Sequence, residues 1–224
     1  MKLYMHPIST TSRPVMQFIA DNDMKVDMEV VDILKGQHYE PAYSTLNPNH
    51  LIPLLDDDGF RLTESAAILR YLADKIGSPA YPKDLKQRAK VNEVMDWINT
   101  NFYRDWAYGF IYPQLFPHHK RKTDEIHAAT IDWGKERAQD WLRLLDQYWI
   151  GPNKRYLVGD QITIADYFGA ALVTLGEVIR CDFAKYPNVQ RWLNNMKTLK
   201  SWPKVNEVFY GLVDSVKQQP FNAI

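Results

Sequence analysis

The spacing of hydrophobic positions divides the chain into two parts. Up to about residue 78, short runs of the β type alternate with helical stretches, which is the pattern of an α/β domain. Residues 2–5 and 26–31 predict strands, and residues 11–22 predict a helix with Pro14 in its first turn. After residue 86 the strand signals almost vanish. The pattern therefore predicts an α/β unit followed by a helical unit.

A hairpin and a further helix complete the predicted α/β unit. Residues 53–55 and 60–62 flank the Asp-Asp-Gly of residues 57–59, and an Asp-Gly pair favours a tight turn with positive φ. Residues 37–46 predict a short helix, and residues 65–76 predict a longer one. In the second unit the spacing predicts helical stretches over residues 85–115, 123–149, 163–180, 189–199 and 204–216.

Composition narrows the possible classes of protein. The 224 residues include 27 basic and 27 acidic side chains, so the net charge is zero and a polyanionic partner such as nucleic acid is not expected. No apolar run approaches the roughly 20 residues of a membrane helix, and residues 1–10 lack the apolar stretch of a secretory signal. The single cysteine, Cys181, excludes an intrachain disulfide. We therefore expect a protein of the reducing cytoplasm, without a membrane partner.

The loop of residues 6–13 (HPISTTSR) is the first segment with candidate chemistry. It opens a predicted helix, so its hydroxyls lie near free backbone N–H groups that favour negative charge. Redox proteins of the thioredoxin type carry Cys-x-x-Cys there, whereas this chain has Ser9-x-x-Ser12. A hydroxyl cannot perform thiol redox chemistry, but it can donate a hydrogen bond to the thiolate of another molecule. The alternative is structural: Thr11 or Ser12 caps the helix.

Two further segments carry candidate binding groups. Pro53 enters a predicted strand within the apolar residues 51–54, although a proline cannot donate to the ladder. A cis Ile52-Pro53 bond would turn the chain and leave the Ile52 backbone free to pair with a ligand, although most such bonds are trans. Residues 63–65 (TES) precede a helix whose first N–H groups can hold a carboxylate. The alternative is that Ser65 is an N-cap serine.

In combination these segments resemble the glutathione transferases. Residues 1–77 look like the thioredoxin-like domain of the theta and delta classes, which use serine rather than tyrosine. The family's motifs are matched nearly residue for residue at 31–38 (VDILKGQH), 47–53 (NPNHLIP) and 63–72 (TESAAILRYL). Residues 156–166 (YLVGDQITIAD) resemble the signature of the family's helical domain. The resemblance therefore spans nearly the whole chain.

The resemblance implies the fold and its division. We expect an α/β thioredoxin-like N-terminal domain (βαβ–ββα, with a four-stranded mixed sheet) and an all-α C-terminal helical bundle. The implied boundaries are residues 1–78 for the glutathione-binding domain, 79–86 for a linker and 87–224 for the helical domain that contributes the electrophile pocket. Thr163 and Asp166 fit a capping box at the start of a core helix, a structural role.

The resemblance also implies a role for each matching position. Ser9 matches the serine whose hydroxyl stabilises the glutathione thiolate, and Ile52, before Pro53, matches the backbone partner of the cysteinyl part. Glu64 and Ser65 match the pair that holds the γ-glutamyl end of glutathione. His38 and His50 match side chains near its glycyl carboxylate.

The loop departs from the family pattern at two positions. The family usually has Ser-x-Pro-x-Arg, whereas residues 9–13 are STTSR. Thr11 replaces the proline and Ser12 replaces a frequent cysteine, so three further hydroxyls surround Ser9. Ser9 is the primary assignment for the thiolate contact, and Ser12 is the alternative.

The implied function is a glutathione transferase that acts in detoxification. Such an enzyme activates the glutathione thiol as a thiolate for nucleophilic attack on an apolar electrophile, with dehalogenase, isomerase or peroxidase variants on the same scaffold. Residues 103–116 are rich in aromatic side chains, most of which we expect in the core. Tyr103, Trp106 and Phe110 are the candidates for the electrophile pocket.

Other functions have weaker support in the sequence. His118 and His119 adjoin basic residues 120–122 without acidic or cysteine partners at ligand spacing, so we expect a solvated turn and no metal. The glycines form no nucleotide-binding fingerprint. We expect Cys181 to be a buried, small apolar residue.

A non-catalytic binding or regulatory module with this fold is the alternative function. The complete set of Ser9, Pro53 and Glu64-Ser65 favours catalysis, because a module has no need to keep a glutathione pocket. The family usually forms homodimers across the helix at 65–76 and the first long helix. The apolar residues near that region are Ala66, Ile68, Leu69, Leu72 and Met95.

Overall fold

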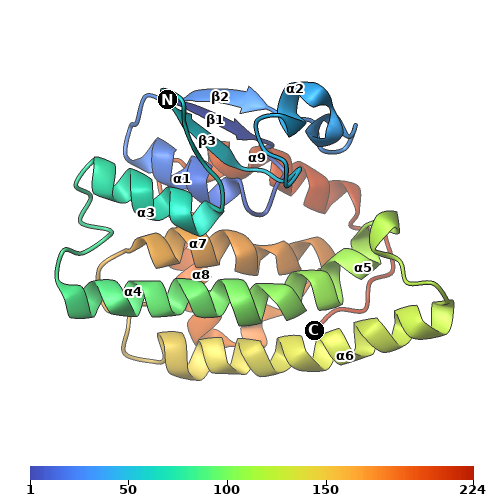
Figure 1. Ribbon diagram of the computed structural model, residues 1–224. Helices are drawn as coiled ribbons and strands as arrows, with labels where there is room; N and C mark the ends of the chain where they lie inside the picture. Colours follow the sequence, from blue (N-terminus) through green and yellow to red (C-terminus); the bar gives the residue numbers. More distant parts are fainter.

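A four-stranded mixed sheet forms the first layer of the computed structural model, which describes residues 1–224 (Figure 1). Its strands are β1 (Lys2–Met5), β2 (Asp27–Val30), β3 (Leu54–Asp57) and β4 (Phe60–Leu62), in the order β2-β1-β3-β4. β1 and β2 are parallel, and the other two pairs are antiparallel. The predicted four-stranded mixed sheet is confirmed.

The hairpin between β3 and β4 turns at the predicted residues. Asp58 and Gly59 have φ values of 53° and 92°, as a two-residue turn with both residues left-handed requires. Strand β2 differs from the expected alternation, because all four of its residues are exposed. It is an edge strand, so its side chains gain less cover than those of the central strands β1 and β3.

Two helices lie between the sheet and the helical unit (Figure 1). They are α1 (Arg13–Asp21) and α3 (Ser65–Lys75), and a short η1 (Gln37–Tyr39) and α2 (Pro41–Ser44) lie near the end of β2. Pro14 occupies the first turn of α1, where a missing N–H costs nothing. Gly77 follows α3 with a φ of 64°, which suits a glycine at a helix end.

The second unit is entirely helical. A long helix begins as α4 (Leu85–Trp97), continues through the π-helical η2 (Ile98–Phe102) and η3 (Arg104–Ile111), and ends as α5 (Tyr112–Leu115). The other helical elements are η4 (Pro117–His119), α6 (Asp124–Leu144), η5 (Leu145–Ile150), α7 (Ile164–Val173), η6 (Thr174–Ile179), η7 (Phe183–Lys185), α8 (Pro187–Lys197) and α9 (Trp202–Ser215). The predicted all-helical second unit is confirmed.

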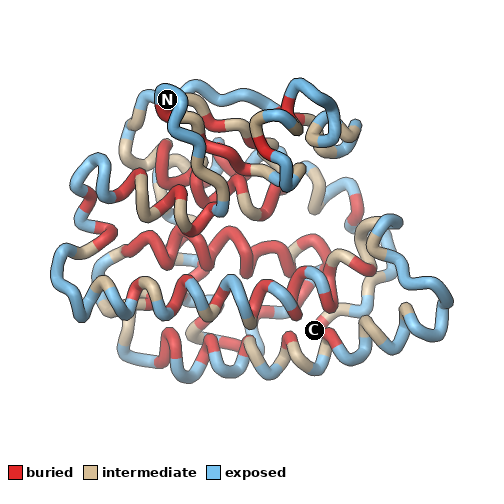
Figure 2. The backbone as a smooth tube through the Cα atoms, in the orientation of Figure 1, coloured by how far each residue is buried: buried red, intermediate tan, exposed pale blue.

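Helix α7 is the centre of the core, and all ten of its residues are buried (Figure 2). Its capping box is the one predicted: the Asp166 carboxylate accepts hydrogen bonds from the Thr163 N–H at 2.8 Å and the Thr163 hydroxyl at 2.9 Å. Asp166 also accepts bonds from the Leu157 N–H at 2.8 Å and the Trp192 indole at 2.9 Å. Four donors thus satisfy one fully buried carboxylate.

One continuous hydrophobic core joins the two units. It contains 51 buried residues, from Leu3 in β1 to Ile224 at the C-terminus. Four of the apolar residues expected near a dimer interface belong to this core, since Ile68, Leu69, Leu72 and Met95 are each 0% exposed. These four side chains pack within the chain and are not part of its exposed surface.

Candidate active site

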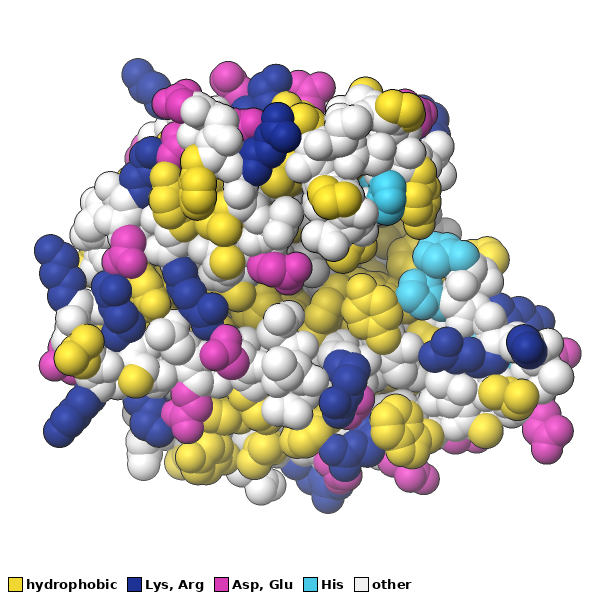
Figure 3. All heavy atoms as spheres, viewed as in Figure 1, with side chains coloured by type: hydrophobic (Ala, Val, Ile, Leu, Met, Phe, Trp, Pro, Cys, Tyr) yellow, Lys and Arg dark blue, Asp and Glu magenta, His cyan; other side chains and the backbone are white.

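A cavity of about 1080 Å³ opens between the two units. Figure 3 shows this hollow with hydrophobic side chains on its floor and histidines on both sides of its right-hand end. From the α/β unit it is lined by Ser9, Thr10, Thr11, His38, His50, Ile52, Pro53, Glu64 and Ser65, among others. The sequence motifs that lie far apart along the chain therefore meet in one place.

Ser9 lies at this cavity, immediately before helix α1. Its side chain is held by the turn: Ser9 Oγ accepts the Ser12 N–H at 3.2 Å and lies 3.2 Å from Thr11 Oγ1. The Ser9 carbonyl accepts the N–H groups of Ser12 and Arg13, which closes the first turn. The hydroxyl is thus positioned at the positive end of the helix dipole.

Ser12 does not line the cavity. It is 0% exposed, and its Oγ is a buried atom without a hydrogen-bond partner. Ser9 lines the cavity and Ser12 does not, so the Ser9 hydroxyl is the better placed of the two for a ligand sulfur. The predicted capping by Thr11 or Ser12 is wrong, since Ser9 Oγ accepts the N–H at the start of the helix.

The Ile52-Pro53 peptide bond is cis, which was one of the two possibilities that the sequence left open. Before it, the Ile52 N–H has no acceptor within the protein. The Ile52 carbonyl accepts a hydrogen bond from Thr11 Oγ1 at 3.0 Å. This stretch of backbone therefore faces the cavity with one free donor and one shared acceptor.

Glu64 and Ser65 lie at the start of helix α3 and line the same cavity. Glu64 has a φ of 66° and occupies the N-cap position, so Ser65 is not the N-cap that one interpretation expected. The Ser65 hydroxyl instead donates to the Thr11 carbonyl at 2.7 Å, which joins the two helix starts. Carboxylate binding here would use the free N–H groups of the first turn.

His38 and His50 lie together on the far side of the α/β part of the cavity. The His50 Nδ1–H donates to the His38 carbonyl at 3.1 Å, and the Tyr39 ring lies beside both imidazoles. The His38 Nδ1 is buried without a hydrogen-bond partner. Burial lowers the pKa of His38, and the neighbouring His50 and His118 lower it further. The His38 ring can therefore serve as a neutral hydrogen-bonding group at neutral pH.

The helical unit supplies an aromatic wall that differs in part from the prediction. Tyr103 lines the cavity, as expected. Trp106 and Phe110 do not: both are 0% exposed, and the Trp106 indole donates to the Leu172 carbonyl at 3.1 Å. These two residues lie on the core face of the helix, four positions apart. The cavity face instead carries Arg104, Tyr108, Tyr112, Leu115 and Phe116.

Two tyrosines connect this wall to the Ser9 loop. The Tyr112 hydroxyl donates to Thr10 Oγ1 at 3.2 Å and lies 2.8 Å from the Tyr103 hydroxyl. Burial raises the pKa of Tyr112 to about 12, so this phenol stays protonated at neutral pH. The aromatic richness of residues 103–116 indicated the wall, but nothing in the sequence singled out the bond across 102 positions to Thr10.

Three further features bear on the chemistry: possible metal ligands, the single cysteine and the apolar character of the helices. No group of three His, Cys, Asp or Glu side chains is arranged to hold a metal ion. Cys181 is buried, as predicted, and burial raises the pKa of its thiol to about 12. No helix has both the length and the apolar character needed to span a membrane.

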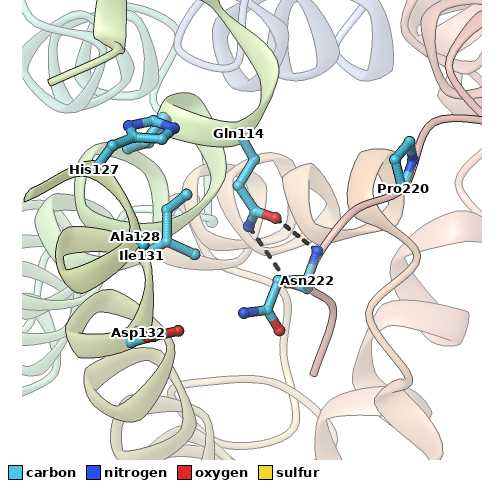
Figure 4. A pocket seen from close by; sticks show the side chains of 8 residues that line it. Gln114, His127, Ala128, Ile131, Asp132, Pro220 and Asn222 are labelled. Atoms are coloured by element: carbon cyan, nitrogen blue, oxygen red, sulfur yellow. Dashed lines mark hydrogen bonds between the residues drawn. The ribbon is translucent and has the colours of Figure 1, made fainter. Parts of the chain in front are cut away.

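A second, smaller cavity of about 360 Å³ lies between α5, α6 and the C-terminal tail (Figure 4). The Gln114 side chain binds the tail there through two hydrogen bonds. Its Oε1 accepts the Asn222 N–H at 2.7 Å, and its Nε2 donates to the Asn222 carbonyl at 3.3 Å. Lys135 donates to the Asn222 side chain at 2.6 Å. These polar groups are satisfied by one another, and none of the candidate thiolate-site residues lines this cavity.

The fold and the cavity define a class of protein: a thioredoxin-like domain, joined to a helical bundle, with a hydroxyl at a helix start in place of the redox cysteines. A family model described as the N-terminal domain of glutathione S-transferase matches residues 1–74. A second model, described as the C-terminal domain of glutathione S-transferase, matches residues 115–200.

Solved structures agree with these matches. A delta-class glutathione transferase from Nilaparvata lugens is 30% identical, with a TM-score of 0.81 over 96% of this chain and 99% of that chain. Human glutathione S-transferase T1-1 is 27% identical, with a TM-score of 0.82 over 99% and 92%. A diazinon-metabolizing glutathione S-transferase from the silkworm Bombyx mori is 29% identical, with a TM-score of 0.78 over 97% and 98%. The chain belongs to the glutathione S-transferase family and is a glutathione transferase.

Proposed function

We propose that Ser9 donates a hydrogen bond to the glutathione thiolate and thereby activates it for attack on an apolar electrophile. The observation that supports this assignment most directly is the position of Ser9 Oγ in the cavity, at the start of helix α1. Ser9 acts as a donor and not as a base, because no imidazole or carboxylate contacts its hydroxyl.

The energy required is within the reach of these groups. A free thiol has a pKa of about 8.5, and lowering it by about two units needs roughly 2.7 kcal/mol of preferential stabilisation of the anion. A hydrogen bond to a charged acceptor contributes about 1.5–3 kcal/mol, and a helix N-terminus adds about 0.3–1 kcal/mol. Positioning the thiolate beside the electrophile supplies the rest of the catalysis.

The other parts of glutathione bind to further groups that line the cavity. Its cysteinyl backbone pairs with Ile52, whose N–H is free, beside the cis Pro53. The γ-glutamyl end binds Glu64 and Ser65 at the start of α3, where N–H groups can hold its carboxylate. The glycyl carboxylate lies near His38 and His50.

The electrophile occupies the part of the cavity lined by the helical unit. Aromatic and aliphatic side chains from the long helix and α9 surround it there, which favours an apolar ligand. These are Tyr103, Tyr108, Tyr112, Leu115, Phe116, Phe209 and Leu212.

The first experiment is a pH titration of thiolate absorbance with bound glutathione. The wild-type protein should show a thiol pKa well below 8.5, and Ser9→Ala should return it toward that free value, with at least a tenfold loss of conjugation rate. Ser215→Ala is the matched control, because this hydroxyl lies at the exposed end of α9 and donates only to the Leu212 carbonyl. Glutathione binding without any change in thiol pKa would overturn the assignment of Ser9.

The proposal includes a homodimer, the domain boundaries 1–78, 79–86 and 87–224, and a cytoplasmic location. Exposed apolar side chains at α3 include Phe60, whose ring lies beside that of Tyr71, and the C-cap residue Ile76, at 52% and 42%. We expect the molar mass in solution to be twice 26.2 kDa at micromolar concentration, as measured by light scattering. A mass of one chain at every concentration would contradict the dimer.

A further inference from the structure

Thr11 is the residue of the loop that departs from the family's proline, and its side chain joins two parts of the glutathione site. Thr11 Oγ1 lies 3.0 Å from the Ile52 carbonyl and 3.2 Å from Ser9 Oγ. A carbonyl oxygen only accepts, so the single Thr11 hydroxyl proton points to Ile52. The bond between Ser9 and Thr11 must then use the Ser9 proton. Both hydroxyl protons are therefore used inside the protein: Ser9 donates to Thr11, and Thr11 donates to the Ile52 carbonyl.

This series of hydrogen bonds ends on the Ile52 carbonyl oxygen, an atom that a bound peptide would also use. In the proposed function the cysteinyl backbone of glutathione pairs with Ile52, which has a free N–H and a carbonyl already bonded to Thr11. A carbonyl oxygen has two lone pairs, but a second donor draws electron density from it, so a ligand N–H there weakens the bond from the Thr11 hydroxyl. Weakening the Thr11–Ile52 bond frees the Thr11 proton, and Ser9 need no longer donate to Thr11.

We propose that Thr11 is a second hydroxyl donor to the glutathione thiolate, released from the Ile52 carbonyl when the peptide backbone of glutathione binds there. This inference rests on the proposed role of Ser9. The sulfur loses its proton to solvent, while Ser9 and Thr11 both keep theirs and donate to the anion. Recognition of the ligand backbone and activation of its thiol are thereby coupled through one side chain.

The neighbouring hydroxyls do not fit this role. Ser12 Oγ is buried outside the cavity. Thr10 Oγ1 lies beside the aromatic wall, where it accepts the Tyr112 hydroxyl at 3.2 Å. Thr11 alone contacts both Ser9 and Ile52. The main chain at Thr11 is fixed independently of its side chain, because the Thr11 carbonyl accepts the Ser65 hydroxyl at 2.7 Å.

The test compares Thr11→Val, which removes the hydroxyl and keeps the shape, with Thr11→Ser, which keeps the hydroxyl. For each variant, the pKa of bound glutathione is measured by thiolate absorbance and its Kd by calorimetry. Thr11→Val should raise the thiol pKa by about one unit, which leaves up to tenfold less thiolate, while glutathione binds as tightly or more tightly. Thr11→Ser should keep the wild-type pKa. Thr45→Val is a control for hydroxyl loss, because Thr45 bonds only the Pro41 carbonyl on exposed α2.

Two results would overturn the proposal. One is an unchanged thiol pKa in Thr11→Val when Ser9→Ala raises it, which leaves the function intact with Ser9 as the only donor. The other is a parallel loss of affinity and of melting temperature in both Thr11 variants, which indicates a structural role. If the wild-type protein itself fails to lower the thiol pKa, the proposed function fails, and the role of Thr11 fails with it.

Discussion

Arg13 is the residue through which the two units are joined most directly. Arg13 is 1% exposed, and its guanidinium donates to the Asn206 side chain at 2.9 Å, the Ala171 carbonyl at 2.7 Å and the Thr174 hydroxyl at 3.3 Å. The Phe209 ring lies 3.7 Å from the guanidinium carbon. Burial lowers the pKa of Arg13 to about 10, so the group stays charged at neutral pH without a carboxylate partner.

We expect Arg13→Ala to lower the free energy of unfolding by about 3 kcal/mol, because it leaves buried acceptors unpaired and opens space under Phe209. Arg13→Lys should lose less, since an ammonium keeps the charge but not the forked geometry. Urea denaturation measures both variants. Arg61→Ala is the control: its ion pair with Asp56 at 3.4 Å is exposed, and such pairs contribute about 0–1 kcal/mol. Equal losses in Arg13→Ala and Arg61→Ala would contradict this role.

The location of single residues at the cavity was predicted well where a motif fixes it and poorly where packing decides. Ser9 and Glu64 each precede a helix and Ile52 precedes a strand, and the family motifs singled out all three, which do line one cavity. The difference in exposure between Ser9 and Ser12 could not be predicted, since both hydroxyls flank the same turn. Thr11 was noticed as a departure, but its bond to Ile52 spans 41 positions and has no local signal.

At the scale of elements, the turns and caps where elements begin and end were predicted more reliably than the faces that helices turn to the core or the cavity. The hairpin at residues 57–59 and the capping box of α7 have chemical signatures, namely Asp-Gly and Thr-x-x-Asp, and both formed as expected. The long helix over residues 85–115 carries aromatic side chains on two faces. Phe102, Trp106 and Phe110 face the core, whereas Tyr108 and Tyr112 face the cavity. Hydrophobicity does not distinguish these faces, because phenol and phenyl rings suit both.

The position of the C-terminal tail, a segment without regular structure, could not be predicted from the sequence pattern either. Its Asn222 backbone is held by Gln114 (Figure 4). Its Ile224 carbonyl accepts the Asp182 N–H at 2.8 Å. Gln114 belongs to α5, the same short helix from which Tyr112 and Leu115 line the active-site cavity. No pattern in residues 217–224 predicts this docking, which depends on a glutamine about a hundred positions away.

At the scale of the whole molecule, the mouth of the cavity brings histidines of the two units together. Burial lowers the pKa of His38 in the α/β unit, and His50 and, from the helical unit, His118 lower it further. Burial also lowers the pKa of His119, with His118 and Arg121 adding to the effect. An imidazole whose pKa falls on folding is stabilising while neutral, because the unfolded chain binds its proton more tightly. This stability is present in full above the ordinary value of 6.5 and is lost as the pH falls below it.

We therefore expect the urea midpoint of unfolding to be lower at pH 5.5 than at pH 7.5, and the two units to separate more readily in acid. Replacing both rings in His38→Gln/His119→Gln should reduce this pH dependence without removing it, because burial also lowers the pKa of His6. His127→Gln is the matched control, since this ring lies on α6 beside the smaller cavity (Figure 4). An equal fall of the midpoint in the wild type and the double variant would show that the acid sensitivity arises elsewhere. A smaller fall in the double variant would place it at the mouth of the active-site cavity, where the two units meet.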